Sequence, residues 1–239
     1  MQRRNGFLAE TFRRKLNADA GPGANLPSLP PMPLRVFGND ERQRLSRLTV
    51  NGPVSFIEPP LWVRTDDRPT DLRFITTIGR LNADPVRTRE ATVNYARYRE
   101  IFPQVRKVKL ENTANGFNVD LKLGVGLGFL SLPIRTSLAH VWDKDQSLVF
   151  NAYAGDVEHI HGRWRWEAQP EGAGTWMTLH SAGKVGAHPP YVLRVAQQLP
   201  YNDFLPTMGA QVISLHKFSA WLDQGRDRMT PTVRQKDSD

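Results

Sequence analysis

The chain has 239 residues, a formal net charge of +8 and no cysteine. This length can form one sizeable domain with extensions, and the lack of cysteine excludes disulfide frameworks, thiolate catalysis and cysteine-ligated zinc or iron–sulfur centres. The positive charge favours an anionic partner, although the arginines are scattered rather than gathered in one block.

Residues 1–34 are predicted to form a basic leader and a linker rich in proline and glycine. The first 20 residues can form a short amphipathic helix with arginine and lysine at the edge of its apolar side, which would give a peripheral contact with an anionic membrane. The alternative is a leader that is solvated or docked on a partner. Since no apolar run is long enough to span a bilayer or to act as a signal peptide, we expect a cytoplasmic protein.

Residues 35–70 are predicted to form an irregular arm with short strands. The strand candidates are RLTVNG and VSFI, and the turn-rich segment EPPLWVRTDDRPTD follows them. The pattern assigns no function to this arm.

From residue 71 the pattern becomes regular. The β-rich segment LRFITTIGRL precedes a helical stretch, with Asp84 as the expected N-cap, Pro85 as its first residue and Pro103 beyond its end. Six strand candidates follow, separated by turn signals such as TANG and DKDQ, and these short connections favour an antiparallel meander. A long amphipathic helix is expected from Pro206 to a stop at Gly225, and residues 225–239 form a polar tail.

This order of elements predicts an α+β helix-grip fold. In that fold, a strongly curved antiparallel sheet of about seven strands would wrap around the long C-terminal helix. Two short helices would follow the first strand, and a cavity would lie between the sheet and the C-terminal helix.

The chain resembles the START-like superfamily in its final helix and in three segments: ADPVRTREATVNYARYREIFPQVRKVKL, LGFLSLPIRTSLAH and AGDVEHIHGRWRWEAQPEGAGTWMTLHS. The resemblance is to the polyketide cyclase/dehydrase and coenzyme-Q-binding-protein branch and covers residues 71–224. It implies a domain that encloses an apolar ligand such as a lipid, an isoprenoid quinone or a polyketide-like aromatic compound. Many proteins of this kind carry their ligand without chemistry.

Strand alternation assigns side chains to the cavity. In the strand candidate around residues 130–142, the apolar residues share a face with Thr136 and His140. A buried imidazole at His140 can orient a carbonyl ligand or act as an acid or base, which makes it the one catalytic candidate; the alternative is a histidine near the rim, bonded to backbone or water. The predicted cavity lining is Leu132, Ile134, Thr136, Leu138, His140, Trp142, Phe150, Trp164, Trp166, Met208, Val212 and Leu215.

The stretch AGDVEHIHGRWRW, residues 154–166, carries two histidines at alternate positions. Strand geometry puts His159 and His161 on one face with two arginines, and Trp164 and Trp166 on the other. Two imidazoles so placed can bind one metal ion. Because the nearby acids alternate to the opposite side, we predict a solvated basic outer face, with no metal site and no cofactor.

Two further patterns carry no site. GVGLG, residues 124–128, only superficially resembles a phosphate-binding loop, because a strand-like segment rather than a helix follows it; a bend or bulge in a curved sheet is expected. His180 has no visible partner. No zinc finger, RNA-recognition signature or convincing helix-turn-helix is present, so specific nucleic-acid binding is not expected.

Three functional hypotheses follow. The first is binding or transport of a hydrophobic small molecule in the cavity. The second is an enzyme of the polyketide cyclase or aromatase type that uses inward polar groups. The third is a membrane-associated or protein-interaction domain whose cavity is filled by side chains.

Overall fold

The computed structural model describes residues 37–65, 68–127, 130–143, 147–157, 159–169, 172, 174–184, 194, 197–198 and 200–225. The predicted leader and linker, residues 1–34, and the polar tail after residue 225 lie outside this part of the chain. Within it, no helix is both long enough and apolar enough to cross a membrane.

Eight strands and a long C-terminal helix make up most of the described chain. In chain order the elements are α2 (Asn39–Leu48), η1 (Thr49–Asn51), β1 (Val54–Thr65), β2 (Arg68–Leu81), α3 (Pro85–Val93), η2 (Tyr95–Arg97), α4 (Tyr98–Ile101), β3 (Val105–Thr113), β4 (Gly116–Leu127), β5 (Leu130–Trp142), β6 (Ser147–Gly155), β7 (His159–Ala168), β8 (Thr175–Lys184) and α6 (Leu205–Asp223).

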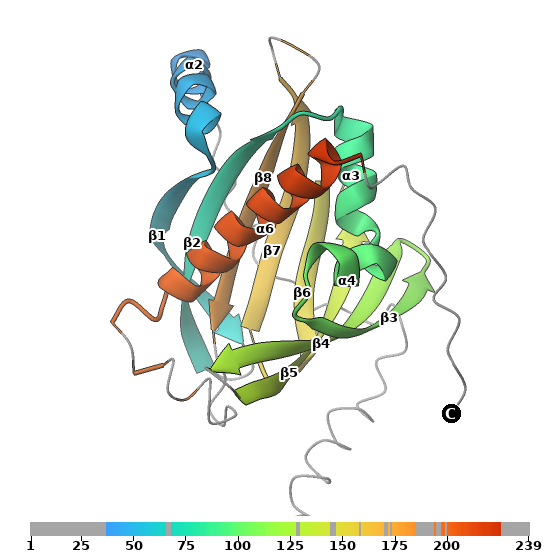
Figure 1. Ribbon diagram of the computed structural model, residues 1–239. Helices are drawn as coiled ribbons and strands as arrows, with labels where there is room; N and C mark the ends of the chain where they lie inside the picture. Colours follow the sequence, from blue (N-terminus) through green and yellow to red (C-terminus); the bar gives the residue numbers. More distant parts are fainter. Residues whose placement is uncertain are drawn as a thin grey trace, which may run out of the picture.

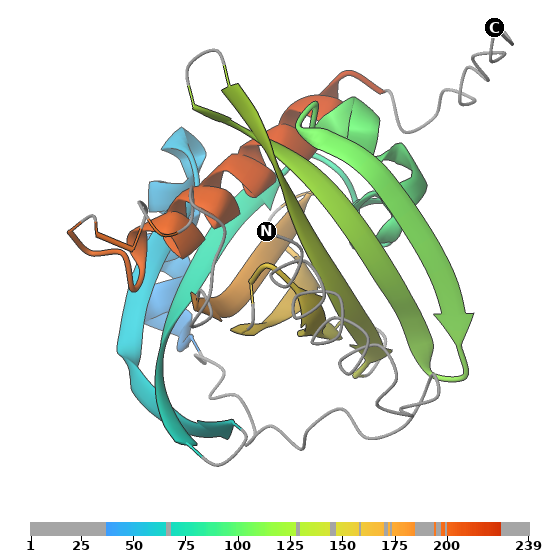
Figure 2. The same ribbon diagram turned by 90° about the horizontal axis from the view of Figure 1, so that it is seen from below.

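The strands form one antiparallel sheet in the order β1-β2-β8-β7-β6-β5-β4-β3. The sheet curves strongly, and α6 lies across its concave side (Figures 1 and 2). Helices α3 and α4 connect β2 to β3, which stand far apart in the sheet. The predicted helix-grip fold is therefore confirmed. Strand β1, which begins at the predicted strand VSFI of the arm, joins the sheet as an eighth strand.

The expected helix boundaries follow from local chemistry. The Asp84 side chain accepts a hydrogen bond from the backbone N–H of Arg87 at 2.9 Å, and Pro85 occupies the first helical position. Both features stabilise a helix start, because the first N–H groups of a helix have no partner within it. At the other end of the domain, α6 stops just before Gly225, whose φ of 66° lies in the left-handed region that favours glycine.

The arm between residues 35 and 70 differs from its prediction. RLTVNG is not a strand, since it spans the end of α2 and the short helix η1. The segment predicted to be turn-rich instead continues β1 to Thr65 and begins β2 at Arg68. Prolines 59 and 60 are tolerated because β1 is an edge strand and its register shifts between Ile57 and Pro60.

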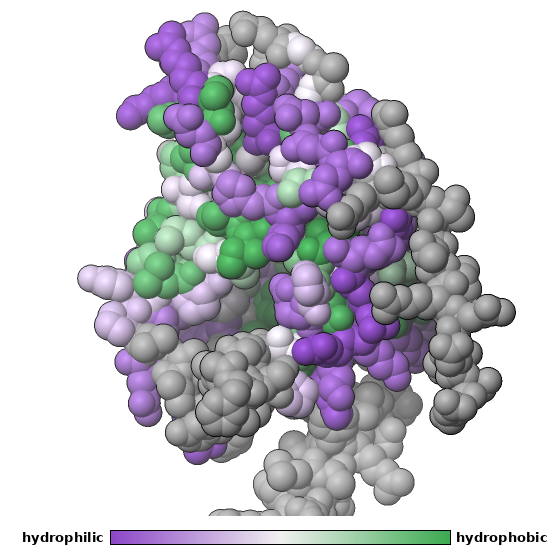
Figure 3. All heavy atoms as spheres, viewed as in Figure 1, coloured by the Kyte–Doolittle hydropathy of each residue, from purple (hydrophilic) through white to green (hydrophobic). Residues whose placement is uncertain are grey.

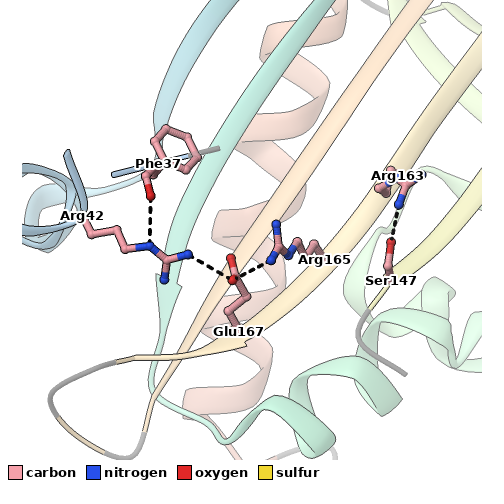
Figure 4. Close-up of polar contacts among 6 residues, drawn as sticks. All are labelled: Phe37, Arg42, Ser147, Arg163, Arg165 and Glu167. Carbon is pink, nitrogen blue, oxygen red and sulfur yellow. Dashed lines mark hydrogen bonds and ion pairs between the residues drawn. The ribbon is translucent and has the colours of Figure 1, made fainter. Parts of the chain in front are cut away.

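Helix α2 is tied to the convex side of the sheet through Arg42. Its guanidinium donates to the carbonyl of Phe37 at 3.3 Å and to Glu167 Oε1 on β7 at 3.5 Å (Figure 4). It also lies 5.9 Å from the ring centre of Trp176 on β8, within cation–π range. The arm before β2 thus packs on the same sheet as the rest of the domain.

Candidate functional site

The concave face of the sheet has two ends of different character. At the first, which we call the aromatic end, Phe218 of α6 contacts three rings from other elements. Its ring centre lies 5.3 Å from that of Phe102, 5.8 Å from that of Tyr98 and 6.1 Å from that of Trp164, all in edge-to-face geometry. Since all four residues are buried, side chains fill this end.

The second end, which we call the open end, lies below the N-terminal half of α6. There α6 packs chiefly on β2, with smaller contacts to β8 and β1, so the inner faces of β4 and β5 stand apart from it. Hydrophobic residues gather over the N-terminal half of α6 and in the hollow beneath it, whereas the C-terminal half of the helix is mostly polar on this face (Figure 3). The open end consists of Leu121, Leu123, Ile134, Leu138 and Ile160 from the sheet and of Met208 and Val212 from α6.

A buried polar pair stands between the two ends. The hydroxyl of Tyr95, from η2, lies 2.8 Å from His140 Nε2 on β5. The imidazole stacks on Phe117, with ring centres 4.5 Å apart and planes 11° from parallel. The Tyr98 hydroxyl donates its own proton to the Thr92 carbonyl. If Tyr95 is the donor in its contact with His140, the imidazole accepts at Nε2 and carries its proton on Nδ1.

Burial fixes the protonation states of this pair. Desolvation lowers the pKa of His140 to about 3, and the nearby carbonyls of Leu138 and Phe117 offset only part of that effect. Burial raises the pKa of Tyr95 well above its ordinary value of 10. Near neutral pH both side chains are uncharged, which suits a hydrogen-bonding role better than proton transfer.

Two buried polar atoms on this wall have no hydrogen-bond partner among the described residues. They are Nδ1 of His140, which no acceptor reaches with acceptable geometry, and Oγ1 of Thr136 on the same strand. Both side chains lie on the concave face, at 1% and 5% exposure. An unsatisfied buried polar group costs about 1–3 kcal/mol, so such atoms require an explanation.

The predicted lining residues fall into both ends. Ile134 and Leu138 belong to the open end with Met208 and Val212, whereas Leu215 is buried against Gly79 of β2. The two tryptophans of β7 face inward as predicted, but they sit in the packed core: Trp166 donates to Thr92 Oγ1 at 3.2 Å. Trp142 contacts the Trp166 ring and is 38% exposed. The side chain of Leu132 lies outside the described residues.

The outer face of β7 is less solvated than predicted. His161 is only 3% exposed, and its Nδ1 lies 2.9 Å from Asn151 Oδ1 on β6. Arg163 is partly buried and donates to Ser147 at 3.2 Å (Figure 4). It also donates to Asp143. These contacts replace water as hydrogen-bond partners. Among the residues that the structure describes, no three histidine or carboxylate side chains gather as a metal site.

His180, which had no visible partner in the sequence, belongs to a polar chain across three strands. Its Nδ1 lies 2.8 Å from Thr76 Oγ1, and that hydroxyl donates to Glu58 Oε1 at 2.6 Å. The imidazole also stacks on Phe74, with ring centres 4.8 Å apart. Burial lowers the pKa of His180 to about 4, although the charge of Glu58 opposes this. The chain lies on the convex face, away from the open end.

Gln211 is a polar residue that the sequence did not single out. It is buried on the sheet side of α6, where Oε1 accepts from Thr77 at 2.5 Å. Its Nε2 donates to the Ile75 carbonyl at 3.0 Å and to Ser181 Oγ at 2.7 Å. These bonds fix the height and angle of α6 over β2 and β8 beside the open end.

A separate surface groove of about 380 Å³ lies on the other side of α6. It is open to solvent and bounded by η1, the end of β2 and polar residues such as Arg80, His216 and Ser219. Among the described residues, its lining shares Leu215 with the predicted cavity and is otherwise separate from it.

Comparisons with known proteins identify the fold but no closer relationship. No family model and no curated protein matches the chain. The structure is similar to that of TTHA0849 from Thermus thermophilus, with a TM-score of 0.50, 17% identity, and coverage of 63% of this chain and 97% of that one. At this identity the match shows the fold alone, and it agrees with the START-like resemblance at that level.

Two other solved structures score slightly lower. The Zhui aromatase/cyclase from Streptomyces sp. R1128 is 16% identical with a TM-score of 0.48, covering 68% of this chain and 98% of that one. The human StarD13 lipid transfer and protein localization domain is 9% identical with a TM-score of 0.47, covering 78% and 98% respectively. Because one fold hosts different functions, the function must be argued from the side chains of this chain.

Proposed function

We propose that this protein binds a hydrophobic small molecule at the open end of the concave face. The observation that carries the proposal is the pair of buried, unpartnered polar atoms, His140 Nδ1 and Thr136 Oγ1, on an otherwise apolar wall of the described chain. Ligand sites commonly combine apolar surface, which supplies affinity, with a few polar groups that set orientation. A lipid, an isoprenoid quinone or a polyketide-like aromatic compound has the required apolar body.

The distance between the two polar groups indicates the length and the chemistry of the preferred ligand. Thr136 and His140 are four residues apart on one strand, so their Cα atoms are about 13 Å apart, with Leu138 between them. His140 presents a donor at Nδ1, which pairs with a carbonyl or hydroxyl oxygen. The preferred ligand is therefore an elongated apolar molecule that carries oxygen.

The experiment is native mass spectrometry of the purified full chain, with extraction and identification of bound compounds, followed by titration with a panel of lipids, quinones and aromatic polyketides. We expect an oxygen-bearing apolar ligand whose affinity falls about tenfold in His140→Phe, the loss of one buried hydrogen bond. His180→Phe, the same change on the convex face, is the matched control and should bind normally. A folded chain that takes up nothing from the panel would refute the proposal and favour a filled interior with an interaction role.

The second candidate is an enzyme of the cyclase or aromatase type. The Tyr95–His140 contact favours it, because an imidazole and a phenol beside an apolar site are possible proton-transfer groups. Their pKa values oppose it, since that of His140 is about 3 and that of Tyr95 is raised, whereas efficient general acids and bases titrate near the working pH. Full cyclisation activity in both His140→Ala and Tyr95→Phe would exclude this pair as catalysts.

A further inference from the structure

We propose that residues 26–36, the part of the linker next to the domain, dock on an apolar patch of the convex face of the sheet. The patch is a small cluster apart from the main core and comes from β2, β6 and β8: Leu72, Phe74, Val149 and Ala182. Ala182 lies opposite His161 and Val149 opposite Arg163, both on the outer face of β7. We call these four residues the convex patch.

The convex patch is buried, although all of its described members belong to the sheet. Leu72 is 1% exposed, Phe74 2% and Ala182 1%. A sheet face without a second layer is normally solvated, so this burial requires a cover. Helices α3, α4 and α6 lie on the concave side (Figures 1 and 2), and α2 reaches the convex side at Trp176, six residues before Ala182 and about 20 Å along β8. The cluster itself includes no helix residue of the described chain.

The linker joins the described chain beside the convex patch. Phe37, the first described residue, packs on Phe56 of β1, with ring centres 5.8 Å apart. Phe56 lies opposite Thr76 of β2. Thr76 in turn contacts His180, whose ring stacks on Phe74 of the patch. The linker therefore meets the domain on the convex face, close to the surface that we propose it covers.

The linker has the composition and the length to cover the patch. Between Ala20 and Phe37 the only charged residue is Arg35, and the apolar side chains nearest the domain are Leu26, Leu29, Met32, Leu34 and Val36. The four prolines of residues 26–36 favour an extended polyproline II chain, which at about 3.1 Å per residue would reach roughly 34 Å. From β1 to β6 the sheet has four inter-strand spacings of about 4.8 Å, roughly 19 Å in all.

An extended segment also suits two polar atoms beside the patch. The Thr76 hydroxyl donates its one proton to Glu58, so it accepts from His180 Nδ1 and leaves His180 Nε2 as an acceptor. That Nε2 atom and the Nε donor of Arg163, which lies opposite His180, are buried and have no hydrogen-bond partner among the described residues. The backbone N–H and C=O groups of an extended chain can pair with both atoms. The docking proposal concerns the convex face alone and does not require the proposed ligand.

The first test measures thiol reactivity in the full chain, which has no native cysteine. Met32→Cys and Leu34→Cys, made separately, report on the linker, and Leu8→Cys in the leader is the matched control. At least one of the two linker thiols should react with a maleimide about tenfold more slowly than the control, because a docked segment must open before it reacts. Reaction of both linker thiols at the control rate would overturn the proposal, whatever the stability of other variants.

The second test asks whether the linker protects the patch. Val149→Cys places a thiol in the convex patch, and the added pair Met32→Asp and Leu34→Asp should speed its reaction about tenfold, because a carboxylate is costly to bury. The control pair Leu8→Asp and Leu16→Asp makes the same change of charge in the leader and should leave the rate unchanged. An unchanged rate in the linker variant would assign the cover to another part of the chain, and equal acceleration by both pairs would show a general charge effect; either result overturns the proposal.

A third measurement separates the linker from a second copy of the chain as the cover. The reaction rate of Val149→Cys is measured over a range of protein concentrations, with light scattering to give the oligomeric state. Protection by the linker of the same chain does not depend on concentration, so we expect a constant rate. A rate that rises on dilution, together with dissociation of a dimer, would assign the patch to contact between two copies and overturn the proposal.

Discussion

The aromatic end and the open end share one sheet face and one helix, yet they are built differently. At the aromatic end, the rings of Tyr98, Phe102 and Trp164 pack edge to face around Phe218 in the second half of α6. At the open end, the aliphatic side chains Leu121, Leu123 and Ile160 are only partly buried. The fold therefore separates the densely packed part of the concave face from the part where we propose that a ligand binds.

Removal of a ring from the aromatic end should have the largest effect. Phe218→Ala leaves a cavity among three aromatic neighbours and should lower the free energy of unfolding by about 3–5 kcal/mol. Urea unfolding followed by circular dichroism measures this loss. The matched change at the open end, Leu123→Ala, should cost about 1 kcal/mol because Leu123 is half-buried. Equal losses would remove the distinction between the two ends.

Gln211 holds α6 in place between the two ends. Its substitution should have the second-largest effect on the free energy of unfolding. Gln211→Leu removes the helix partner of Thr77, of Ser181 and of the Ile75 carbonyl, although Thr77 keeps its hydrogen bond with Ser55. This loss should cost about 2–3 kcal/mol in the same unfolding experiment. Gln224→Leu, at the exposed end of α6, is the control and should change stability by less than about 0.5 kcal/mol. A loss at residue 211 no larger than the control would show that the polar contacts do not secure the helix.

The histidine between the two ends should make stability depend on pH. The pKa of His140 falls from an ordinary value of 6.5 to about 3 on folding, so the unfolded chain binds the extra proton between these pH values. Stability is therefore retained above pH 6.5 and decreases as the pH falls toward 3, by about 1–2 kcal/mol between pH 7 and pH 5. His140→Phe should reduce this slope in urea titrations at the two pH values. An unchanged slope would contradict a neutral buried imidazole.

The last variant should have the smallest effect on stability and the largest effect on ligand binding. Leu123→Trp adds a ring on the half-buried wall of the open end and should change the free energy of unfolding by less than about 1 kcal/mol. The added ring should block uptake of the ligand found by native mass spectrometry. Normal uptake by the variant would place the ligand elsewhere.

Much of the fold could be predicted because its signals are local. Alternation put Thr136 and His140 on the inner face of β5, and the Asp84–Pro85 start of α3 follows from capping chemistry. The start of α2 also has a local signal in the sequence, which the strand prediction for RLTVNG did not take into account. Glu41 lies in the first turn of that helix and accepts the N–H of Gly38 at 3.2 Å.

The partnerships within the candidate site could not be predicted in this way. Tyr95 and His140 are 45 residues apart in the sequence, and Thr76 and His180 are 104 apart. Strand alternation predicts which face of the sheet a side chain lies on, but it does not predict which distant element contacts the side chain there. Gln211 shows the same limit, since a glutamine in an amphipathic helix gives no sign that three sheet groups will satisfy it.

The pairing of β2 with β8 also has a consequence for synthesis of the chain. Ile75 pairs with Ser181, so during translation β2 must wait for about 100 further residues before its partner leaves the ribosome. At roughly 5–20 residues per second this wait lasts about 5–20 s. Over that time the β1–β2 hairpin lacks its neighbour β8, while Phe74, Ile75 and Ile78 are residues that the finished domain buries. Exposed apolar side chains on an unpaired strand edge favour aggregation.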